Sequence, residues 1–311
     1  MDVRGSEALR DTRIDMGVLE NPLLAAAGFV VSFLVLIFSR WKCGGTTLLR
    51  PWVWLIVATG TPAIVESLVW LQTRDPATEL ESSIGWIAAS RFVGAASLLL
   101  PVVSLLGAKR PQDRAWHLIV LSLWVVLVLP AAESYLLRSG GSIQIHDARG
   151  WFLWILVFTG LVNYLPTKHW LACLLFAAAQ IAMLAGYLPL LKSAAGNATC
   201  WPALSAFLVC SAVGLCAASA IRNRNDRPLG DSPGNDANNR KFYWQAFCDS
   251  FGFLWGMRVA ERVNALSGRS RLRLDWRRIV ETESNGDEDA DSVFQQNYRS
   301  HLLRFVDDDW L

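Results

Sequence analysis

Three ionisable residues within apolar stretches, Glu66, Arg91 and Glu133, are the side chains of this chain best suited to chemistry. A charge at the centre of a membrane helix costs about 2.5–3.5 kcal/mol on insertion scales, so such residues mark functional or structural sites. Together they could bind a ligand, a proton or an ion. The alternative, which we favour, is an Arg–carboxylate pair that fixes the register of two helices, with the second glutamate near the headgroups or protonated.

Their positions place all three at a similar depth. At about 1.5 Å of rise per residue, Glu66 lies about 22 Å and Glu133 about 25 Å from the inner ends of their apolar runs, and Arg91 lies about 10 Å from the outer face. The hydrocarbon core is about 30 Å thick, so all three fall in its outer third. Pro62 and Pro130 precede the glutamates and bend their helices. Small residues on the same helix faces favour positions inside a bundle, so we expect one charged cluster.

Other sequence signals of chemistry are weak. The chain contains no H-E-x-x-H, G-x-S-x-G, Walker or G-x-G-x-x-G motif, and its six cysteines form no C-x-x-C pair. We therefore expect no catalytic residue, no metal site and no cofactor, and an enzyme is disfavoured. Asn163 and Gln180 are each expected to make one hydrogen bond between helices. A short likeness between the segments around Pro62–Glu66 and Pro130–Glu133 is consistent either with an internal repeat or with coincidence.

The elements that must position these residues are seven long apolar runs separated by loops that hold most of the charges. A span of the bilayer core needs about 20 apolar residues in helix, and lipid excludes irregular backbone. The chain is therefore predicted to be an all-α, polytopic membrane protein with a seven-helix bundle over residues 23–221. The fifth run is the shortest. The runs are Leu23–Phe38, Trp52–Leu71, Ile84–Leu106, His117–Leu137, Trp151–Leu165, Trp170–Leu191 and Trp201–Ile221.

The loops between the runs predict the orientation of the bundle. Lys and Arg gather after the first, third, fifth and seventh runs, whereas the loop at residues 72–83 carries one Arg against three acids. The positive-inside rule then places the N-terminal segment 1–22 outside and the C-terminus in the cytoplasm. Residues 1–22 mix Arg with acids, unlike a cleaved signal peptide. The expected location is a cell membrane, with a bacterial inner membrane as the default.

The C-terminal tail begins with a predicted flexible linker at residues 222–240, rich in Asn, Asp, Gly and Pro. Residues 241–311 form a cytoplasmic tail, partly disordered, with an amphipathic helix at about 242–266 that Gly252 and Gly256 weaken. This helix either packs in a small soluble domain or lies in the lipid interface. The residues expected to face lipid or a partner are Trp244, Phe247, Phe251, Trp255, Arg258, Arg262, Arg271, Arg273, Arg277 and Arg278.

These features together favour a non-enzymatic membrane anchor, sensor or scaffold. Its tail would contact a cytoplasmic protein partner or the inner leaflet, and the expected partners include membrane lipids. The arginines of the tail are too few and too little interleaved with aromatics for nucleic-acid binding. The alternative function is a small-solute or proton-coupled transporter built around Glu66, Arg91 and Glu133. A transporter predicts a wet cavity at these charges, whereas a scaffold predicts a dry, paired cluster.

Overall fold

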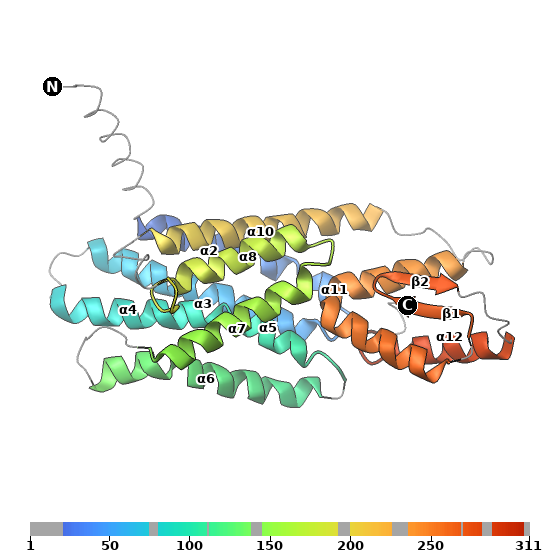
Figure 1. Cartoon of the computed structure of the whole chain (residues 1–311). Helices are drawn as coiled ribbons and strands as arrows, with labels where there is room; N and C mark the ends of the chain where they lie inside the picture. The colour runs from blue at the N-terminus through green and yellow to red at the C-terminus, as the bar shows by residue number, and fades with distance from the viewer. Residues whose placement is uncertain are drawn as a thin grey trace, which may run out of the picture.

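The helices of the N-terminal two thirds of the chain lie side by side in an elongated bundle, and the rest of the chain covers one end of it (Figure 1). The computed structural model describes residues 21–74, 80–110, 112–137, 145–191, 200–225, 236–268, 270–281 and 288–307. The predicted N-terminal segment 1–22 lies almost entirely outside these ranges, and residues 282–287 of the tail also lie outside them. The bundle helices are α2 (Pro22–Phe38), α3 (Leu49–Arg74), α4 (Leu80–Ser97), α5 (Leu100–Leu106), α6 (Asp113–Leu137), α7 (Asp147–Tyr164), α8 (Trp170–Leu184) and α10 (Trp201–Asn225), with a short 3₁₀ turn, η1 (Arg40–Cys43), after α2.

Within the part of the chain that the structure describes, four helical stretches are long and apolar enough to cross a membrane, and they indicate a membrane protein. They are Leu49–Arg74, Gly85–Leu106, Ala115–Tyr135 and Trp201–Ser219. Helices α2 and α8 are apolar but shorter. Helix α7 has 18 residues, with Asp147 and Arg149 in its first turn. Each of the seven predicted runs therefore contains helix, but the run Trp170–Leu191 is helical only to Leu184, and turns follow.

The run Ile84–Leu106 is broken where a single helix was expected. Helix α4 ends at Ser97, Leu98 and Leu99 form a turn, and α5 begins at Leu100. Pro101 is the physical cause, because it has no N–H to donate to the carbonyl of Ser97. Gln180 of α8 donates its side-chain N–H to the carbonyl of Leu98, in the turn between α4 and α5, at 2.8 Å. The hydrogen bond predicted for Gln180 is thus present, and it stabilises a helix break.

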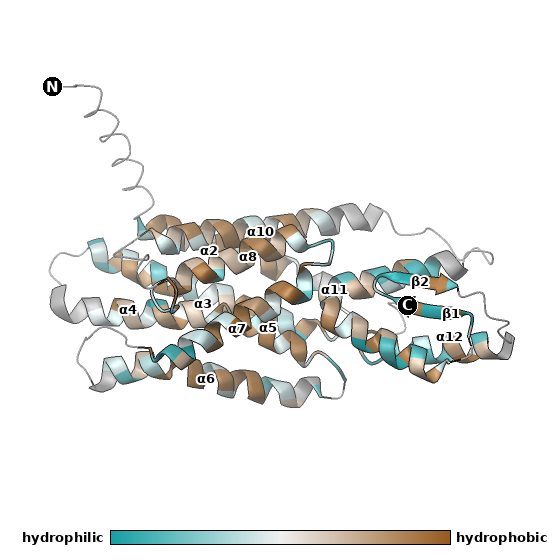
Figure 2. Ribbon diagram, in the orientation of Figure 1, coloured by the Kyte–Doolittle hydropathy of each residue, from teal (hydrophilic) through white to brown (hydrophobic). Residues whose placement is uncertain are grey.

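The bundle core is built from aliphatic side chains and from small residues that let helices approach closely. Helix α2 packs on α3 and α10, and a Cβ added at Gly28 would lie 3.0 Å from the side chain of Ala206. The outer faces carry large apolar side chains, including Ile64, Leu118 and Phe207, that are more than half exposed. Figure 2 shows mostly apolar residues along the bundle helices and more hydrophilic residues in the C-terminal elements. In a bilayer, acyl chains would cover these apolar outer faces, whereas in water the faces would be exposed to solvent.

The tail is folded in its described part, and it contains two short strands that the sequence reading did not predict. Its elements are α11 (Asp236–Leu266), β1 (Leu272–Asp275), β2 (Arg278–Glu281) and α12 (Glu288–Leu302). The strands pair antiparallel, with Leu274 opposite Ile279. We call residues 236–307 the C-terminal unit. Helix α10 continues to Asn225 and α11 begins at Asp236, so the predicted linker 222–240 is helical at both ends and residues 226–235 lie outside the described part.

Helix α11 consists of two arms that meet at Gly252. Gly252 has φ 82° and ψ −178°, a conformation open almost only to glycine. Both arms extend away from the end of the bundle, so that the break itself lies against the bundle (Figure 1). The aromatic core of the unit is continuous with the bundle end, because Leu105 and Ala108 pack in the same cluster as Trp244, Trp255 and Phe305.

Candidate functional site

Glu66 and Arg91 form a buried ion pair between α3 and α4. The Nε and Nη2 atoms of Arg91 donate to Oε1 and Oε2 of Glu66 at 2.8 and 2.9 Å. This two-pronged geometry fits a planar guanidinium to a carboxylate and makes a strong, directional contact. The Glu66 side chain is fully buried, and that of Arg91 is 27% exposed. The helices come close enough for the pair because Gly94 of α4 faces Pro62 of α3.

Glu133 does not join this pair in the structure. It lies exposed on α6, and within the described ranges no ion pair connects it to Arg91. The inward face of α6 carries Val120, Leu127, Ala131 and Ser134. A helix turns about 100° per residue, so Glu133 points away from the face that holds Ser134 and Ala131. The depth estimate for Glu133 does not include the rotation of α6 about its own axis. The cluster of three residues expected from the sequence is therefore a pair of Glu66 and Arg91 in the structure.

The second polar site lies where α7 meets the break in α11. The side chain of Asn163 donates from Nδ2 to the carbonyl of Phe251 at 3.4 Å, and its Oδ1 accepts from the N–H of Leu254 at 2.9 Å. Helix ends leave carbonyl and N–H groups without partners, and an amide side chain both donates and accepts. One residue of the bundle therefore caps the end of one arm and the start of the other. Gly252 is required here, since a Cβ would lie 2.6 Å or less from atoms of the Asn163 side chain.

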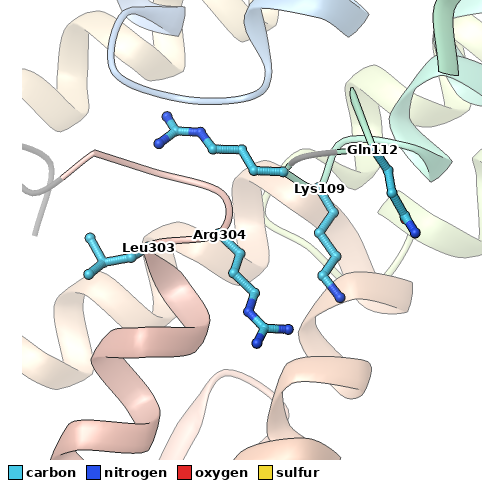
Figure 3. Close-up of a pocket in the computed structure, with 5 residues that line it drawn as sticks. Lys109, Gln112, Leu303 and Arg304 are labelled. Atoms are coloured by element: carbon cyan, nitrogen blue, oxygen red, sulfur yellow. The ribbon is translucent and has the colours of Figure 1, made fainter. Parts of the chain in front are cut away.

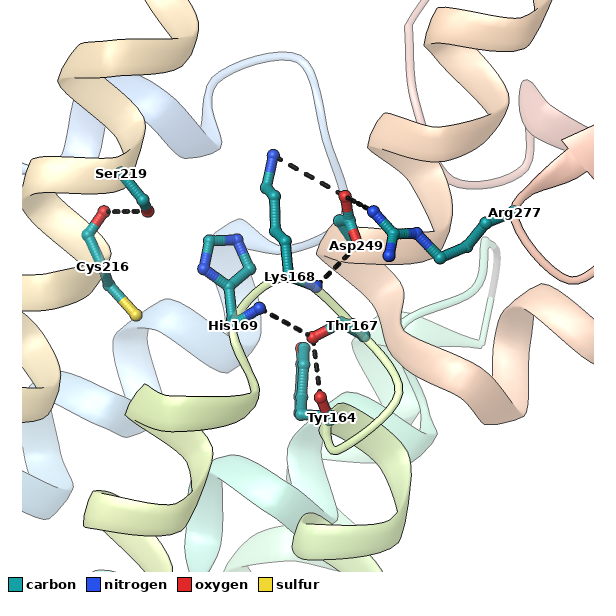
Figure 4. A network of polar contacts seen from close by, with 8 residues as sticks. All are labelled: Tyr164, Thr167, Lys168, His169, Cys216, Ser219, Asp249 and Arg277. Atoms are coloured by element: carbon teal, nitrogen blue, oxygen red, sulfur yellow. Dashed lines mark hydrogen bonds and ion pairs between the residues drawn. The ribbon is translucent and has the colours of Figure 1, made fainter.

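A charged network beside this break ties the loop after α7 to α11 and to the strand turn (Figure 4). Asp249 is buried and accepts from the backbone N–H of Lys168 at 3.1 Å. Its carboxylate also lies 3.7 Å from Nζ of Lys168 and 3.1 Å from Nη2 of Arg277. The hydroxyl of Tyr164 donates to the carbonyl of Ser250 at 2.9 Å. A carboxylate so buried requires these cations, so the network fixes the C-terminal unit on the bundle.

His169 lies in the same loop, close to Lys168. Burial lowers the pKa of its imidazole, and the positive charge of Lys168 lowers it further. Its backbone N–H donates to Oγ1 of Thr167, which in turn donates to the carbonyl of Tyr164. His169 is therefore a neutral member of an ordered turn at neutral pH.

The aromatic residues predicted to face lipid or a partner are buried inside the protein. Trp244, Phe247 and Phe251 are fully covered, and Trp255 is 8% exposed. The indole N–H of Trp244 donates to the carbonyl of Asp275, and that of Trp255 donates to the carbonyl of Leu105. This corrects the expectation for these four residues. The stripe that they form on α11 covers β1, α12 and the bundle end, so the packed alternative is the arrangement observed.

The arginines of the predicted contact surface divide into two groups. Arg277 adopts φ 57° in the turn between the strands and directs its guanidinium to Asp249, so it belongs to the internal network. The side chains of the other five are exposed: Arg258 and Arg262 on α11, and Arg271, Arg273 and Arg278 at the strands.

Sequence reasoning missed the role of the junction residues. Asn163 was expected to bond to another membrane helix, and Asp249 received no role. The available signal was Gly252 in the middle of an aromatic helical stripe, which the sequence reading treated only as a weakening of the helix. No cluster of three or more His, Cys, Asp or Glu side chains suited to a metal ion occurs in the described part of the chain.

Comparison of the chain with protein-family models, with curated proteins and with solved structures gives no match.

Proposed function

We propose that this is a seven-span protein of a cell membrane, with its N-terminus outside and its C-terminus in the cytoplasm, and that it acts as a non-enzymatic anchor or sensor. The C-terminal unit would present the surface that contacts a cytoplasmic partner or the inner leaflet. The observation that carries this proposal is the shared core of the two parts. Leu105 and Ala108 of the bundle pack with Trp255 and Phe305 of the unit, so a displacement of one part must move the other.

The exposed apolar side chains of the shorter helices support seven spans. On α7, Ile155, Phe158 and Val162 are each more than half exposed, and on α8 Trp170 is 50% exposed. Water would not favour such a surface, whereas acyl chains would cover it. The 18 residues of α7 extend about 27 Å, close to the thickness of the hydrocarbon core.

The contacts of the C-terminal unit support the proposed sidedness. Thr46 forms a bridge with Val306, Arg110 pairs with Asp307 at 2.6 Å, and Lys168 meets Asp249. Thr46, Arg110 and Lys168 come from the three loops between runs that were predicted to be cytoplasmic because of their Lys and Arg content. The unit that follows the last span thus lies at the same end of the bundle as the loops it should share a compartment with.

The state of Glu66 gives less support to the transporter alternative. Its carboxylate is fully buried and held by two nitrogen atoms of Arg91, which is the paired arrangement expected of a structural contact. Glu133 lies outside the pair. The two cavities described at the C-terminal unit are lined by none of the three residues.

Two measurements test the proposal. Epitope tags at the two ends should be accessible on opposite sides of intact cells, and two tags on the same side would contradict the orientation. A photo-crosslinking amino acid in place of Val280, which is 43% exposed on the strand pair beside Arg273 and Arg278, should give a discrete protein or phospholipid adduct. The same probe at Gln296 of α12 is the control. If Val280 and Gln296 give the same background, the strand pair is not a contact surface.

A further inference from the structure

A cavity of about 590 Å³ lies at the junction between the bundle and the C-terminal unit. Its walls come from the loop after α5, the second arm of α11 and the end of α12. Lys109, Arg258, Arg262 and Arg304 line it, with Glu261 as the one acid among its lining residues. An adjoining hollow of about 500 Å³ shares Lys109 and Arg304, whose side chains extend in the same direction in Figure 3.

The cations of this cavity are close enough to repel one another. Burial lowers the pKa of Lys109, and the charges of Arg304, Arg262 and Arg258 lower it further. Four cations against one carboxylate leave a formal charge of +3 on the lining side chains. Over the residues that the structure describes, no ion pair joins any of the four to an acid. Like charges held together in this way favour the binding of an anion of more than one charge.

A buried imidazole adds an unused hydrogen-bonding atom to the same cavity. His301 is 9% exposed and lines the cavity, and its Nε2 atom is buried without a hydrogen-bond partner in the described structure. Buried polar atoms in folded proteins are nearly always paired, so such an atom requires an explanation. Because the atom has almost no exposed surface, a ligand oxygen would become its partner only if the imidazole turned toward the cavity.

The walls are held in place by contacts that do not use the charged ends of Lys109, Arg262 and Arg304. The indole N–H of Trp255 donates to the carbonyl of Leu105 at 2.9 Å, and the backbone N–H of Arg110 donates to the carbonyl of Arg304 at 2.9 Å. Arg110 itself pairs with Asp307. The bundle and the C-terminal unit therefore form the cavity jointly, and a bound molecule would bridge them.

We propose that this cavity binds a phosphate-bearing anion, either a lipid headgroup or a soluble phosphorylated compound. Guanidinium groups match phosphate oxygens in pairs, and lysine adds a point charge. The volume lies within the range of small-molecule sites, about 300–1,000 Å³. A carboxylate of one charge would leave most of the repulsion in place, whereas a phosphomonoester carries close to two charges at neutral pH. The proposal goes beyond the proposed function and does not depend on which side of the membrane the unit lies.

Pyrophosphate added to the full chain in nanodiscs of phosphatidylcholine is the test for a soluble ligand. It should raise the melting temperature and slow hydrogen exchange in the second arm of α11 and at the end of α12, relative to sodium chloride of equal ionic strength. Nanodiscs that contain phosphatidic acid test the lipid source. If the headgroup occupies the cavity, they should give the same protection without pyrophosphate, and added pyrophosphate should change little.

The variant Arg262→Gln/Arg304→Gln should weaken pyrophosphate binding by about 10- to 100-fold for each charged contact removed. The matched control, Arg149→Gln/Lys241→Gln, removes two exposed charges outside the cavity and should keep the response. Without pyrophosphate, the cavity variant should melt higher than the wild type, because repulsion is relieved. A purely structural role of the two arginines predicts a lower melting temperature instead. Equal responses of the two variants, or a response to sodium chloride alone, would overturn the proposal.

If the glutamine variant does not fold, Arg262→Lys/Arg304→Lys keeps the charge and loses the paired geometry. It should bind pyrophosphate with intermediate affinity. Affinity equal to that of the wild type would show that only diffuse charge attracts the anion and would contradict a built site.

Discussion

Replacing Gly252 by alanine should open the junction between the bundle and the C-terminal unit. The backbone at φ 82° and ψ −178° is strained for an L-residue by about 1–3 kcal/mol. The new Cβ would also displace the Asn163 side chain, which lies within 2.3–2.6 Å of its position. Loss of the hydrogen bonds to Phe251 and Leu254 adds about 1–3 kcal/mol for the two. The expected cost is therefore about 2–6 kcal/mol.

Hydrogen exchange of α11 in the purified full chain measures this cost directly. Each 1.4 kcal/mol is about a tenfold change, so the amide of Leu254 should exchange about 30- to 10⁴-fold faster in Gly252→Ala. Gly268→Ala is the matched control, because a Cβ there meets no atom within 4 Å. Its exchange should equal that of the wild type.

A double-mutant cycle separates the two contributions. Asn163→Ala removes the same hydrogen bonds without straining the backbone, so the cost of Asn163→Ala and Gly252→Ala together should fall short of the sum of the single costs by about 1–3 kcal/mol. Exact additivity would show that the alanine does not displace Asn163. Equal exchange in Gly252→Ala and Gly268→Ala would show that Gly252 does not hold the junction together.

Three further predictions concern charged and titrating groups. Arg91→Met leaves the Glu66 carboxylate buried without a partner and should destabilise the purified protein by about 3–5 kcal/mol in thermal unfolding, whereas Glu133→Gln at an exposed position should change stability by less than about 0.5 kcal/mol. Burial raises the pKa of the Cys248 thiol to about 12, so iodoacetamide at pH 8 should label it only after denaturation. Its contribution to stability should be complete below pH 9.0 and lost as the pH rises towards 12. Burial and then Arg304 lower the pKa of His301, so the unfolded chain binds the proton more readily than the folded chain. Stability should decline as the pH falls below 6.5, in buffer without polyvalent anions, and His301→Gln should flatten that decline.

Hydrophobic periodicity and run length predicted most of the helices of this chain. Each of the seven apolar runs holds a helix because apolar side chains and backbone hydrogen bonding act together over a whole run. The predicted ends of the helices were less accurate. Pro101 breaks one run and turns replace the last residues of the run Trp170–Leu191, since local backbone chemistry decides where a helix stops.

The polar sites show what depth and spacing along the sequence leave out. Depth brings Glu66 and Arg91 to the same level, and the structure pairs them. The same argument fails for Glu133, because the rotation of α6 about its own axis depends on which face finds a partner. Asn163 and Asp249 lie 88 and 81 residues from their respective partners Phe251 and Lys168, and no local pattern joins such distant positions.

The strand pair was missed for a local reason. Residues 272–275 and 278–281 are only four residues each, and the turn between them is Trp276-Arg277, without the Asn or Gly that usually takes positive φ there. The arginines of this stretch indicated a charged surface, and the alternation of Leu272 and Leu274 with arginines was not used to predict a strand.

The fold of the C-terminal unit depends on the side-chain amide of Asn163, which belongs to the bundle and not to the unit itself. A fragment cut at Asp236 would leave the Phe251 carbonyl and the Leu254 N–H without their partner and would expose the faces of Trp255 and Phe305 that Leu105 covers. The newly exposed apolar faces would favour self-association of the fragment. Binding partners isolated with the fragment would therefore report on these faces and not on the surface of the intact chain. Studies of the C-terminal unit therefore need the bundle helices α5 and α7 in place.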